Sequence, residues 1–173
     1  MLKYVNYDIV FQEIPDEVTL AVNLSGCPVG CPGCHSSFLK GDVGDELSAA
    51  VLDRLLEKYG RDITCLCFMG GDGAPQEVAA LAAYLQEKTS GCLKTGWYSG
   101  RQELPEGFDP SVFDYVKLGP YVEEKGGLRS PATNQRLYKI VAGSGAGKTG
   151  EGIAVKNGQE IFLQDITSVF WEK

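Results

Sequence analysis

Cys27, Cys31 and Cys34 lie within an eight-residue stretch that also holds two prolines and two glycines. Such a stretch cannot continue a regular helix or strand, so it is expected to be a loop. Its glycines permit positive φ angles, which leave backbone N–H groups free to point at thiolate sulfurs. Three thiolates would leave one iron of a cube-shaped iron–sulfur cluster without a protein ligand. An open coordination position is typical of a catalytic metal site, and the pattern therefore predicts metal or redox chemistry.

The spacing Cys-x-x-x-Cys-x-x-Cys resembles the signature of the radical S-adenosylmethionine (SAM) enzymes, and the text from Cys31 to Cys34 is similar to that of the small activating proteins of anaerobic ribonucleotide reductase. The resemblance implies that Cys27, Cys31 and Cys34 hold a [4Fe–4S] cluster whose fourth iron binds the amino and carboxylate groups of SAM. Gly33 departs from the aromatic residue that many members of the superfamily have before the third cysteine. His35 is then the nearest planar ring for the nucleoside.

Other interpretations of these cysteines remain open. A structural zinc site normally needs four ligands, and His35 is the single histidine of the chain. A disulfide framework is typical of secreted proteins, and no secretory feature is present. A ferredoxin-like electron carrier uses four cysteines per cluster in a different spacing. A non-enzymatic metal-binding module would bind iron or zinc without cleaving SAM.

A second motif, Gly70-Gly71-Asp72, follows an expected strand and precedes an expected helix. It resembles the Gly-Gly-Glu/Asp-Pro motif that binds the SAM amino group in the superfamily, although Gly73 stands where proline is usual. The alternative is a plain glycine turn capped by aspartate. Ser99 ends a further strand, and the resemblance implies that its hydroxyl lies near the SAM ribose; the alternative is a serine turn after a packed aromatic strand end.

Two later segments also resemble the activating proteins, those around Lys117 and around Asn134 and Gln135. Lys117 stands at the end of an expected strand, where it is a candidate partner for the SAM carboxylate or for an acidic group of a partner protein. Most exposed lysines do neither. The sequence assigns no role to Asn134 or Gln135.

The remaining cysteines, Cys65, Cys67 and Cys92, fall on apolar stretches expected to be strands. Cys65 and Cys67 share a face because side chains two apart on a strand point the same way. Three thiols are too few for a second complete site of four, so all three are expected to be buried core residues.

Residues 142–149 nearly match the phosphate-binding loop Gly-x-x-x-x-Gly-Lys-Thr, with Ala142 in place of the first glycine. A strand is expected before it, at 137–141. The sequence after Thr149 predicts another strand, so no helix N-terminus is available to hold a phosphate. Residues 142–152 are therefore expected to be a glycine-rich linker.

Hydrophobic periodicity predicts strands that alternate with helices. This alternation is typical of right-handed βαβ units on a parallel sheet. A hairpin is expected at 153–166 around Asn157-Gly158. Asp45 is the expected N-cap of the first helix. The expected strands are 17–25, 63–69, 92–98 and 115–118, after a mixed β-branched and aromatic stretch at 4–14, and the expected helices are 46–59 and 75–88.

The chain of 173 residues is shorter than the roughly 250 residues of a complete (β/α)₈ barrel. The predicted fold is therefore α/β, a partial (incomplete) (β/α) barrel of radical SAM type with a C-terminal β-hairpin. The expected parts are a radical SAM core at 1–141, the linker at 142–152 and the hairpin extension at 153–173. The open side of such a barrel would give a macromolecular substrate room to insert a loop toward the cluster.

A net charge of −7 with 43% hydrophobic residues is ordinary for a globular protein and does not favour nucleic-acid binding. No long apolar run is present, so a cytoplasmic location without membrane association is expected. The resemblance implies reductive cleavage of SAM and transfer of the radical to a glycine of anaerobic (class III) ribonucleotide reductase, with flavodoxin or ferredoxin as the low-potential electron donor. Another short radical SAM enzyme, acting on a different glycyl radical enzyme or on a small molecule, would carry the same motifs.

Overall fold

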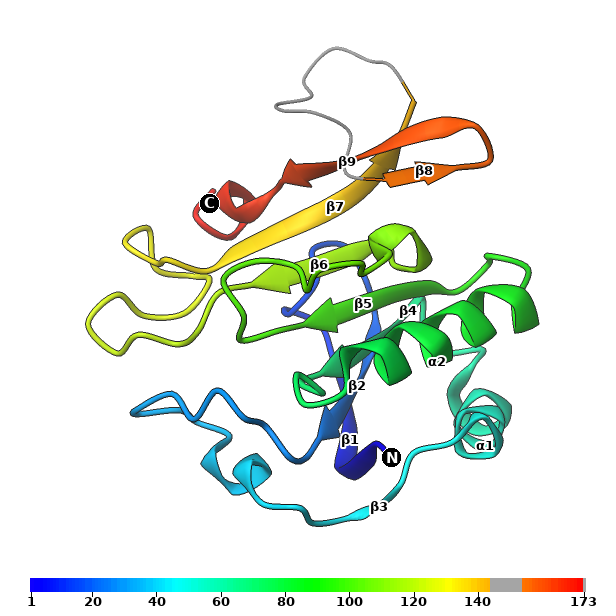
Figure 1. Cartoon of the computed structure of the whole chain (residues 1–173), viewed down its shortest axis with the longest axis horizontal. Helices are drawn as coiled ribbons and strands as arrows, with labels where there is room; N and C mark the ends of the chain where they lie inside the picture. Colours follow the sequence, from blue (N-terminus) through cyan, green and yellow to red (C-terminus); the bar gives the residue numbers. More distant parts are fainter. Residues whose placement is uncertain (144–153, 173) are drawn as a thin grey trace.

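The computed structural model describes residues 1–143 and 154–172. In this part the chain forms one nine-stranded mixed sheet in the order β3-β1-β2-β4-β5-β6-β7-β9-β8, with two α-helices (Figure 1). The sheet is open and does not close into a barrel. The elements are β1 (Lys3–Val10), β2 (Thr19–Leu24), β3 (Asp45–Glu46), α1 (Ala49–Tyr59), β4 (Cys65–Met69), α2 (Pro75–Lys88), β5 (Lys94–Tyr98), β6 (Tyr115–Leu118), β7 (Arg136–Ala142), β8 (Ala154–Lys156) and β9 (Gln159–Asp165), with short 3₁₀ turns η1 (Ser37–Lys40), η2 (Pro110–Val112) and η3 (Thr167–Phe170).

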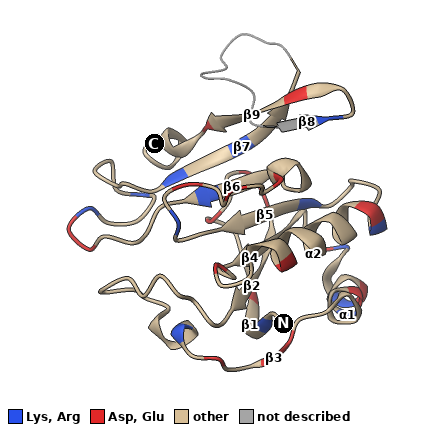
Figure 2. Cartoon of the chain, in the orientation of Figure 1, with Lys and Arg blue, Asp and Glu red and all other residues tan. Residues whose placement is uncertain are grey.

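Four neighbouring strands, β2, β4, β5 and β6, run parallel at the centre of the sheet. Their residues are almost all buried, as expected of parallel strands covered on both faces. The predicted strand and helix alternation is confirmed here. Charged side chains stand mainly on the helices and loops, and within the central strands they are Lys94 at the start of β5 and Lys117 on β6 (Figure 2).

Both helices pack on the same face of the sheet. The main core joins Leu52 of α1 and Val78 of α2 to Leu66 and Phe68 of β4 and to Trp97 of β5. The alternate residues of these strands point to the other face, where a second, smaller core consists of Ile14, Cys65, Cys67, Tyr115 and Leu137. The face that carries no helix is therefore the one on which the strand ends are free to line a cavity.

The start of the first helix differs from the prediction. α1 begins at Ala49 after Ser48, and Asp45 is not its N-cap. Asp45 and Glu46 instead form the short edge strand β3, which pairs with Lys3 and Tyr4 of β1. The tertiary pairing with β1 overrides the local capping signal.

The outer strands reverse direction. β7 lies antiparallel to β6, and β9 and β8 form the predicted hairpin, with Asn157 and Gly158 at positive φ angles of 50° and 76°. β7 extends to Ala142, which pairs with Ile161, so residue 142 belongs to this strand, and the rest of the predicted linker, from 144 to 152, lies outside the described residues. The segment after Gly143 that resembles a phosphate-binding loop lies outside the described residues.

The end of the sheet opposite the cysteine loop is held by the carboxylate of Glu17, which is 6% exposed. Glu17 pairs with the ammonium of Lys94 and accepts hydrogen bonds from Thr64 Oγ1 (2.6 Å) and Tyr115 Oη (2.9 Å). Burial raises the pKa of Glu17, but the hydrogen bonds from Lys94, Thr64 and Tyr115 outweigh burial and hold this pKa below its usual value.

The Glu17→Gln variant is expected to be less stable than wild type by about 2 kcal/mol at pH 7. A lowered native pKa adds stability above the unfolded-state pKa of about 4.3, and this contribution is lost as the pH falls through the native pKa. The stability difference between variant and wild type should therefore shrink in acid. Urea unfolding at pH 7 and pH 3.5, with the exposed Glu46→Gln as control, checks this, and a difference independent of pH would contradict it.

Candidate functional site

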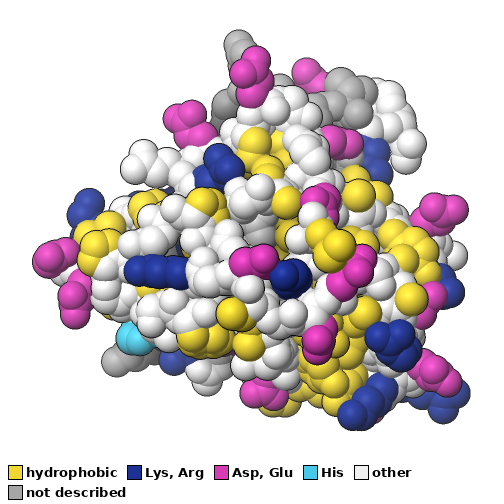
Figure 3. All heavy atoms as spheres, turned by 60° about the horizontal axis from the view of Figure 1, so that its bottom comes forward, with side chains coloured by type: hydrophobic (Ala, Val, Ile, Leu, Met, Phe, Trp, Pro, Cys, Tyr) yellow, Lys and Arg dark blue, Asp and Glu magenta, His cyan; other side chains and the backbone are white. Residues whose placement is uncertain are grey.

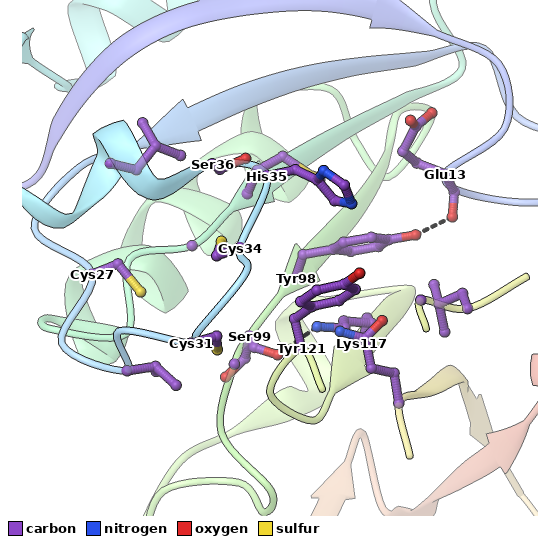
Figure 4. A pocket seen from close by; sticks show the side chains of 18 of the residues that line it. Glu13, Cys27, Cys31, Cys34, His35, Ser36, Tyr98, Ser99, Lys117 and Tyr121 are labelled. Atoms are coloured by element: carbon purple, nitrogen blue, oxygen red, sulfur yellow. Dashed lines mark hydrogen bonds between the residues drawn. The ribbon is translucent and has the colours of Figure 1, made fainter. Parts of the chain in front are cut away.

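A cavity of about 650 Å³ lies at the carboxyl ends of the parallel strands, on the face without helices (Figure 4). The carboxyl end of parallel strands is where α/β folds place their ligands. The loop after β2 supplies the three cysteines and His35, and the turn after β4 supplies Gly70 and Asp72. Ser99 follows β5, Lys117 lies near the end of β6, and the connection from β6 to β7 supplies Tyr121. The structure thus brings residues from four strand ends to one cavity.

The cysteine loop turns through Gly26, Gly30 and Gly33, whose φ angles are 73°, 62° and 72°. These left-handed conformations favour glycine and explain why the loop carries so many of them. All three thiols are free and partly exposed, and all three line the cavity. In Figure 4 the sulfurs of the three cysteines surround one common space. The loop is fixed at its start by a hydrogen bond from Cys27 N to Leu39 O (3.1 Å).

The three thiols do not form a ready-made site for one ion. Among residues 1–143 and 154–172, no three His, Cys, Asp or Glu side chains form a group that could hold a metal ion. The sulfurs of a tetrahedral zinc site approach one another to about 3.8 Å. Cluster thiolates are spread more widely because each binds a different iron. Binding of a [4Fe–4S] cluster by these three thiols therefore stays a prediction.

The turn after β4 is shaped by Gly70 and Gly71, at φ angles of 98° and 86°. The carbonyl of Gly70 accepts a hydrogen bond from Trp97 Nε1 (2.8 Å). A Cβ atom on Gly71 would lie 2.6 Å from Val78 Cγ2 and 2.8 Å from Leu24 Cδ1. Only glycine lets the backbone of this turn pack so closely on the core while it borders the cavity.

The Gly71→Ala variant is expected to be about 3 kcal/mol less stable than wild type, because the positive φ and the contacts with Val78 and Leu24 both oppose a Cβ atom. Gly107→Ala is the matched control, since Gly107 has a φ angle of 69° and no atom within 4 Å of an added Cβ. This control should lose only about 1 kcal/mol. Urea unfolding of both variants measures the difference, and equal losses would show that close packing at Gly71 is unimportant.

Asp72 joins the ends of β4 and β5 and is 1% exposed. Its carboxylate accepts hydrogen bonds from Ser99 Oγ (2.5 Å) and Gly100 N (3.0 Å) and lies 3.7 Å from Arg101 Nε. The Ser99 hydroxyl also accepts a hydrogen bond from Arg101 N (3.0 Å). Both residues line the cavity, but their polar atoms are engaged with the protein. Direct contacts of Asp72 and Ser99 with SAM therefore stay predictions.

Lys117 places a cation in the cavity wall. Its side chain is buried, and Nζ donates hydrogen bonds to the carbonyls of Gly119 (2.7 Å) and Ser99 (3.2 Å). Burial lowers the pKa of Lys117 to about 8, although the negative charge of the Asp72 carboxylate opposes that shift. Two carbonyl partners leave one of the three ammonium hydrogens for a ligand. A carboxylate is the group that such a site favours.

Tyr121 is a cavity residue that the sequence did not single out. Its ring lies 5.4 Å from the ring of His35, centroid to centroid, with an interplanar angle of 57°. The exposed His35 and the half-buried Tyr121 thus link the cysteine loop to the β6–β7 connection (Figure 4). The position of Tyr121 just after β6 could have indicated that it lines the cavity, because β2, β4, β5 and β6 all contribute residues at their carboxyl ends.

Gln135 and Asn134 have structural contacts that the sequence did not predict. Gln135 is buried and lines the cavity, where its Nε2 donates to Gly119 O (3.4 Å). Asn134 Nδ2 donates to Pro120 O (3.0 Å). Both side chains hold the segment that follows β6, which carries Tyr121 and whose Gly119 carbonyl also accepts the hydrogen bond from Lys117.

The predicted burial of Cys65 and Cys67 is confirmed, since both are 0% exposed in the smaller core below the cavity. Burial raises the pKa of both thiols, which keeps them protonated and unreactive. The prediction for Cys92 was wrong, because Cys92 is exposed. β5 begins at Lys94, and Cys92 lies in the turn that follows Gly91.

Searches of protein-family models, of curated proteins and of solved structures found no match to this chain.

None of the helices in the described part is long and apolar enough to cross a membrane. On the face shown in Figure 3, acidic and basic side chains are interspersed. The site itself is therefore the basis for assigning a function.

Proposed function

We propose that this chain is a radical SAM enzyme that activates a glycyl radical enzyme, with anaerobic ribonucleotide reductase as the partner. One observation carries the proposal: three free thiols surround an open space in a cavity that also holds the Gly70–Asp72 turn and Lys117. These are three thiolates for a [4Fe–4S] cluster, a close-packed glycine turn and a cation for the SAM carboxylate. Their spacing in the sequence resembles that of the activating proteins.

The arrangement of helices supports the same class. In doubly wound α/β folds the helices cover both faces of the sheet, whereas in barrels they form an outer layer and the inner face is lined by side chains. Here α1 and α2 share one face, and the opposite face carries the smaller core with the cavity at its carboxyl edge. This favours an open relative of the (β/α) barrel, as the resemblance implies.

Each group of cavity residues has a separate proposed role. Cys27, Cys31 and Cys34 would hold the cluster, which, reduced by flavodoxin or ferredoxin, would supply a low-potential electron for the reductive cleavage of SAM. Lys117 would bind the SAM carboxylate. His35, the residue after Cys34, would provide a planar ring for the nucleoside. Apolar cavity residues exclude water from the reacting atoms.

No acid–base residue is required for this reaction, because hydrogen-atom abstraction moves a proton and an electron together. We place the protein in the cytoplasm, where thiols remain reduced and cluster assembly is possible. A second candidate, activation of a different glycyl radical enzyme, uses the same cavity.

The test is radical formation on a purified partner. The protein is first reconstituted with iron and sulfide under anaerobic conditions. It is then mixed with SAM, dithionite and the glycyl radical subunit of anaerobic ribonucleotide reductase from the same organism. We expect the electron paramagnetic resonance doublet of a glycyl radical. SAM cleavage without a radical on this subunit, but with one on another glycyl radical enzyme, would favour the second candidate.

A further inference from the structure

Two opposite charges are buried in the cavity wall without pairing with each other. Asp72 is 1% exposed and Lys117 is 7% exposed. Among the residues that the structure describes, Asp72 has Arg101 as its ion-pair partner, whereas Lys117 forms no ion pair. A buried charge without an opposite partner is costly, because it has lost its hydration. The unpaired ammonium of Lys117 therefore favours an anionic group of a ligand.

Ser99 lies between these two charges. Its hydroxyl donates to Asp72 Oδ1 (2.5 Å), and its carbonyl accepts a hydrogen bond from Lys117 Nζ (3.2 Å) (Figure 4). The charges remain close enough to interact, since the Asp72 carboxylate acts against the lowering of the Lys117 pKa by burial. An uncompensated Asp72 would therefore compete with a ligand anion for Lys117.

Arg101 compensates the charge of Asp72 from behind the cavity wall. Its Nε lies 3.7 Å from Asp72 Oδ1, and its Nη2 donates to the backbone carbonyl of Asp72 (2.8 Å). The side chain of Arg101 is 40% exposed and does not line the cavity. Arg101 Nε is buried and has no hydrogen-bond acceptor in the described part of the chain, so it acts on the carboxylate as a charge.

The backbone of Arg101 is fixed by the residues that surround Lys117. Arg101 N donates to Ser99 Oγ (3.0 Å), and Arg101 O accepts a hydrogen bond from Gly119 N (2.6 Å). The carbonyls of Ser99 and Gly119 are the two acceptors of Lys117 Nζ. The guanidinium beside Asp72 and the ammonium in the cavity wall are thus held by one network.

We infer that Arg101 is a positioning residue that neutralises Asp72 and so reserves the Lys117 cation for the carboxylate of the ligand. The inference rests on the proposed function and adds a residue that determines how the SAM carboxylate is recognised. With Arg101 in place, the three side chains carry one positive charge in excess. Without it they carry none, and Asp72 draws on Lys117 in place of the ligand. The sequence had not singled out Arg101.

The test uses two ligands that differ in the carboxylate. SAM and decarboxylated SAM share the adenosyl group, the sulfonium and the amine, and the second lacks the carboxylate. Their dissociation constants are measured by anaerobic equilibrium dialysis with the reconstituted wild type, Arg101→Gln and Arg101→Lys. Arg101→Gln is expected to bind SAM about tenfold more weakly than wild type and to bind decarboxylated SAM as wild type does. Arg101→Lys retains the charge and should bind SAM as wild type does.

Arg136→Gln is the matched control. Arg136 is 39% exposed, its Nε lies 3.5 Å from Asp165 Oδ2, and its Nη1 donates to two backbone carbonyls. It differs from Arg101 in that its carboxylate partner is 46% exposed and does not line the cavity. Arg136→Gln should leave both dissociation constants unchanged. If Arg101→Gln does not fold, Arg101→Met takes its place, because it keeps the apolar stem of the side chain without the charge.

The outcomes separate this inference from the proposed function. Wild-type protein that does not bind SAM overturns both. Wild type that binds SAM without forming 5′-deoxyadenosine overturns the proposed function, and the dissociation constants still decide the role of Arg101. Unchanged SAM binding in Arg101→Gln, or an equal loss for SAM and decarboxylated SAM, overturns the inference alone. A loss in Arg101→Lys as large as that in Arg101→Gln would also contradict it, because the shape of the side chain and not its charge would then matter.

Discussion

The Cys31→Ala variant is expected to lose the iron–sulfur cluster and to cleave SAM about a thousandfold more slowly than wild type or not at all. With two thiolates left, a cluster has two irons without thiolate ligands, and the loop offers no further thiol to replace the missing one. The thiol of Cys31 is free and faces the cavity, so its loss should not disturb packing. Iron and sulfide content, the visible absorption of the reconstituted protein and its melting temperature measure the effect.

Cys92→Ala is the matched control, because Cys92 is also a free thiol but is exposed in a turn far along the chain from the loop. It should bind iron and cleave SAM as wild type does. A full cluster in Cys31→Ala, or an equal loss in Cys92→Ala, would mean that the three-cysteine loop is not the cluster site.

The Asp72→Asn variant is expected to reduce SAM cleavage about a hundredfold and to lower the free energy of unfolding by about 2 kcal/mol. Asparagine keeps the shape of the side chain, but its amide nitrogen is a hydrogen-bond donor. This donor would face Gly100 N or Arg101, which are themselves donors. The ends of β4 and β5 should then shift relative to each other. Steady-state kinetics and urea unfolding of the reconstituted protein measure the two effects.

Asp53→Asn provides the comparison, since Asp53 accepts a hydrogen bond from Tyr84 on the outer helices, away from the cavity. It should leave SAM cleavage unchanged. A loss of stability in Asp72→Asn without any loss of activity would show that this carboxylate holds the fold and does not position the site.

Local signals predicted much of this fold because they agree with the tertiary structure. α2 begins at Pro75 and ends at Lys88 as predicted, since proline in the first turn and regular apolar spacing act within the helix itself. The turn at Asn157-Gly158 is likewise decided by two residues. Asp45 was misassigned because its pairing with β1 depends on residues more than forty positions earlier.

The candidate site was predictable where its residues carry unusual spacing, and not where the fold alone brings them in. The spacing of Cys27, Cys31 and Cys34 indicates a set of metal ligands, and the position of Gly71 after an expected strand indicates a turn. Tyr121 and Phe170 are ordinary aromatic residues in the sequence. Phe170 reaches the cavity because β7 runs away from the cysteine loop and β9 runs back toward it, whereas Tyr121 follows the end of β6; this arrangement of strands is a tertiary feature.

The most direct test of the account is SAM cleavage by the purified chain. The protein is reconstituted anaerobically with iron and sulfide, then given SAM and dithionite, and 5′-deoxyadenosine is quantified against a variant with Cys27, Cys31 and Cys34 all replaced by alanine. The account predicts 5′-deoxyadenosine from wild type and none from the triple variant. Wild-type protein that binds iron or zinc but forms no 5′-deoxyadenosine would contradict it, and the chain would then be a metal-binding module.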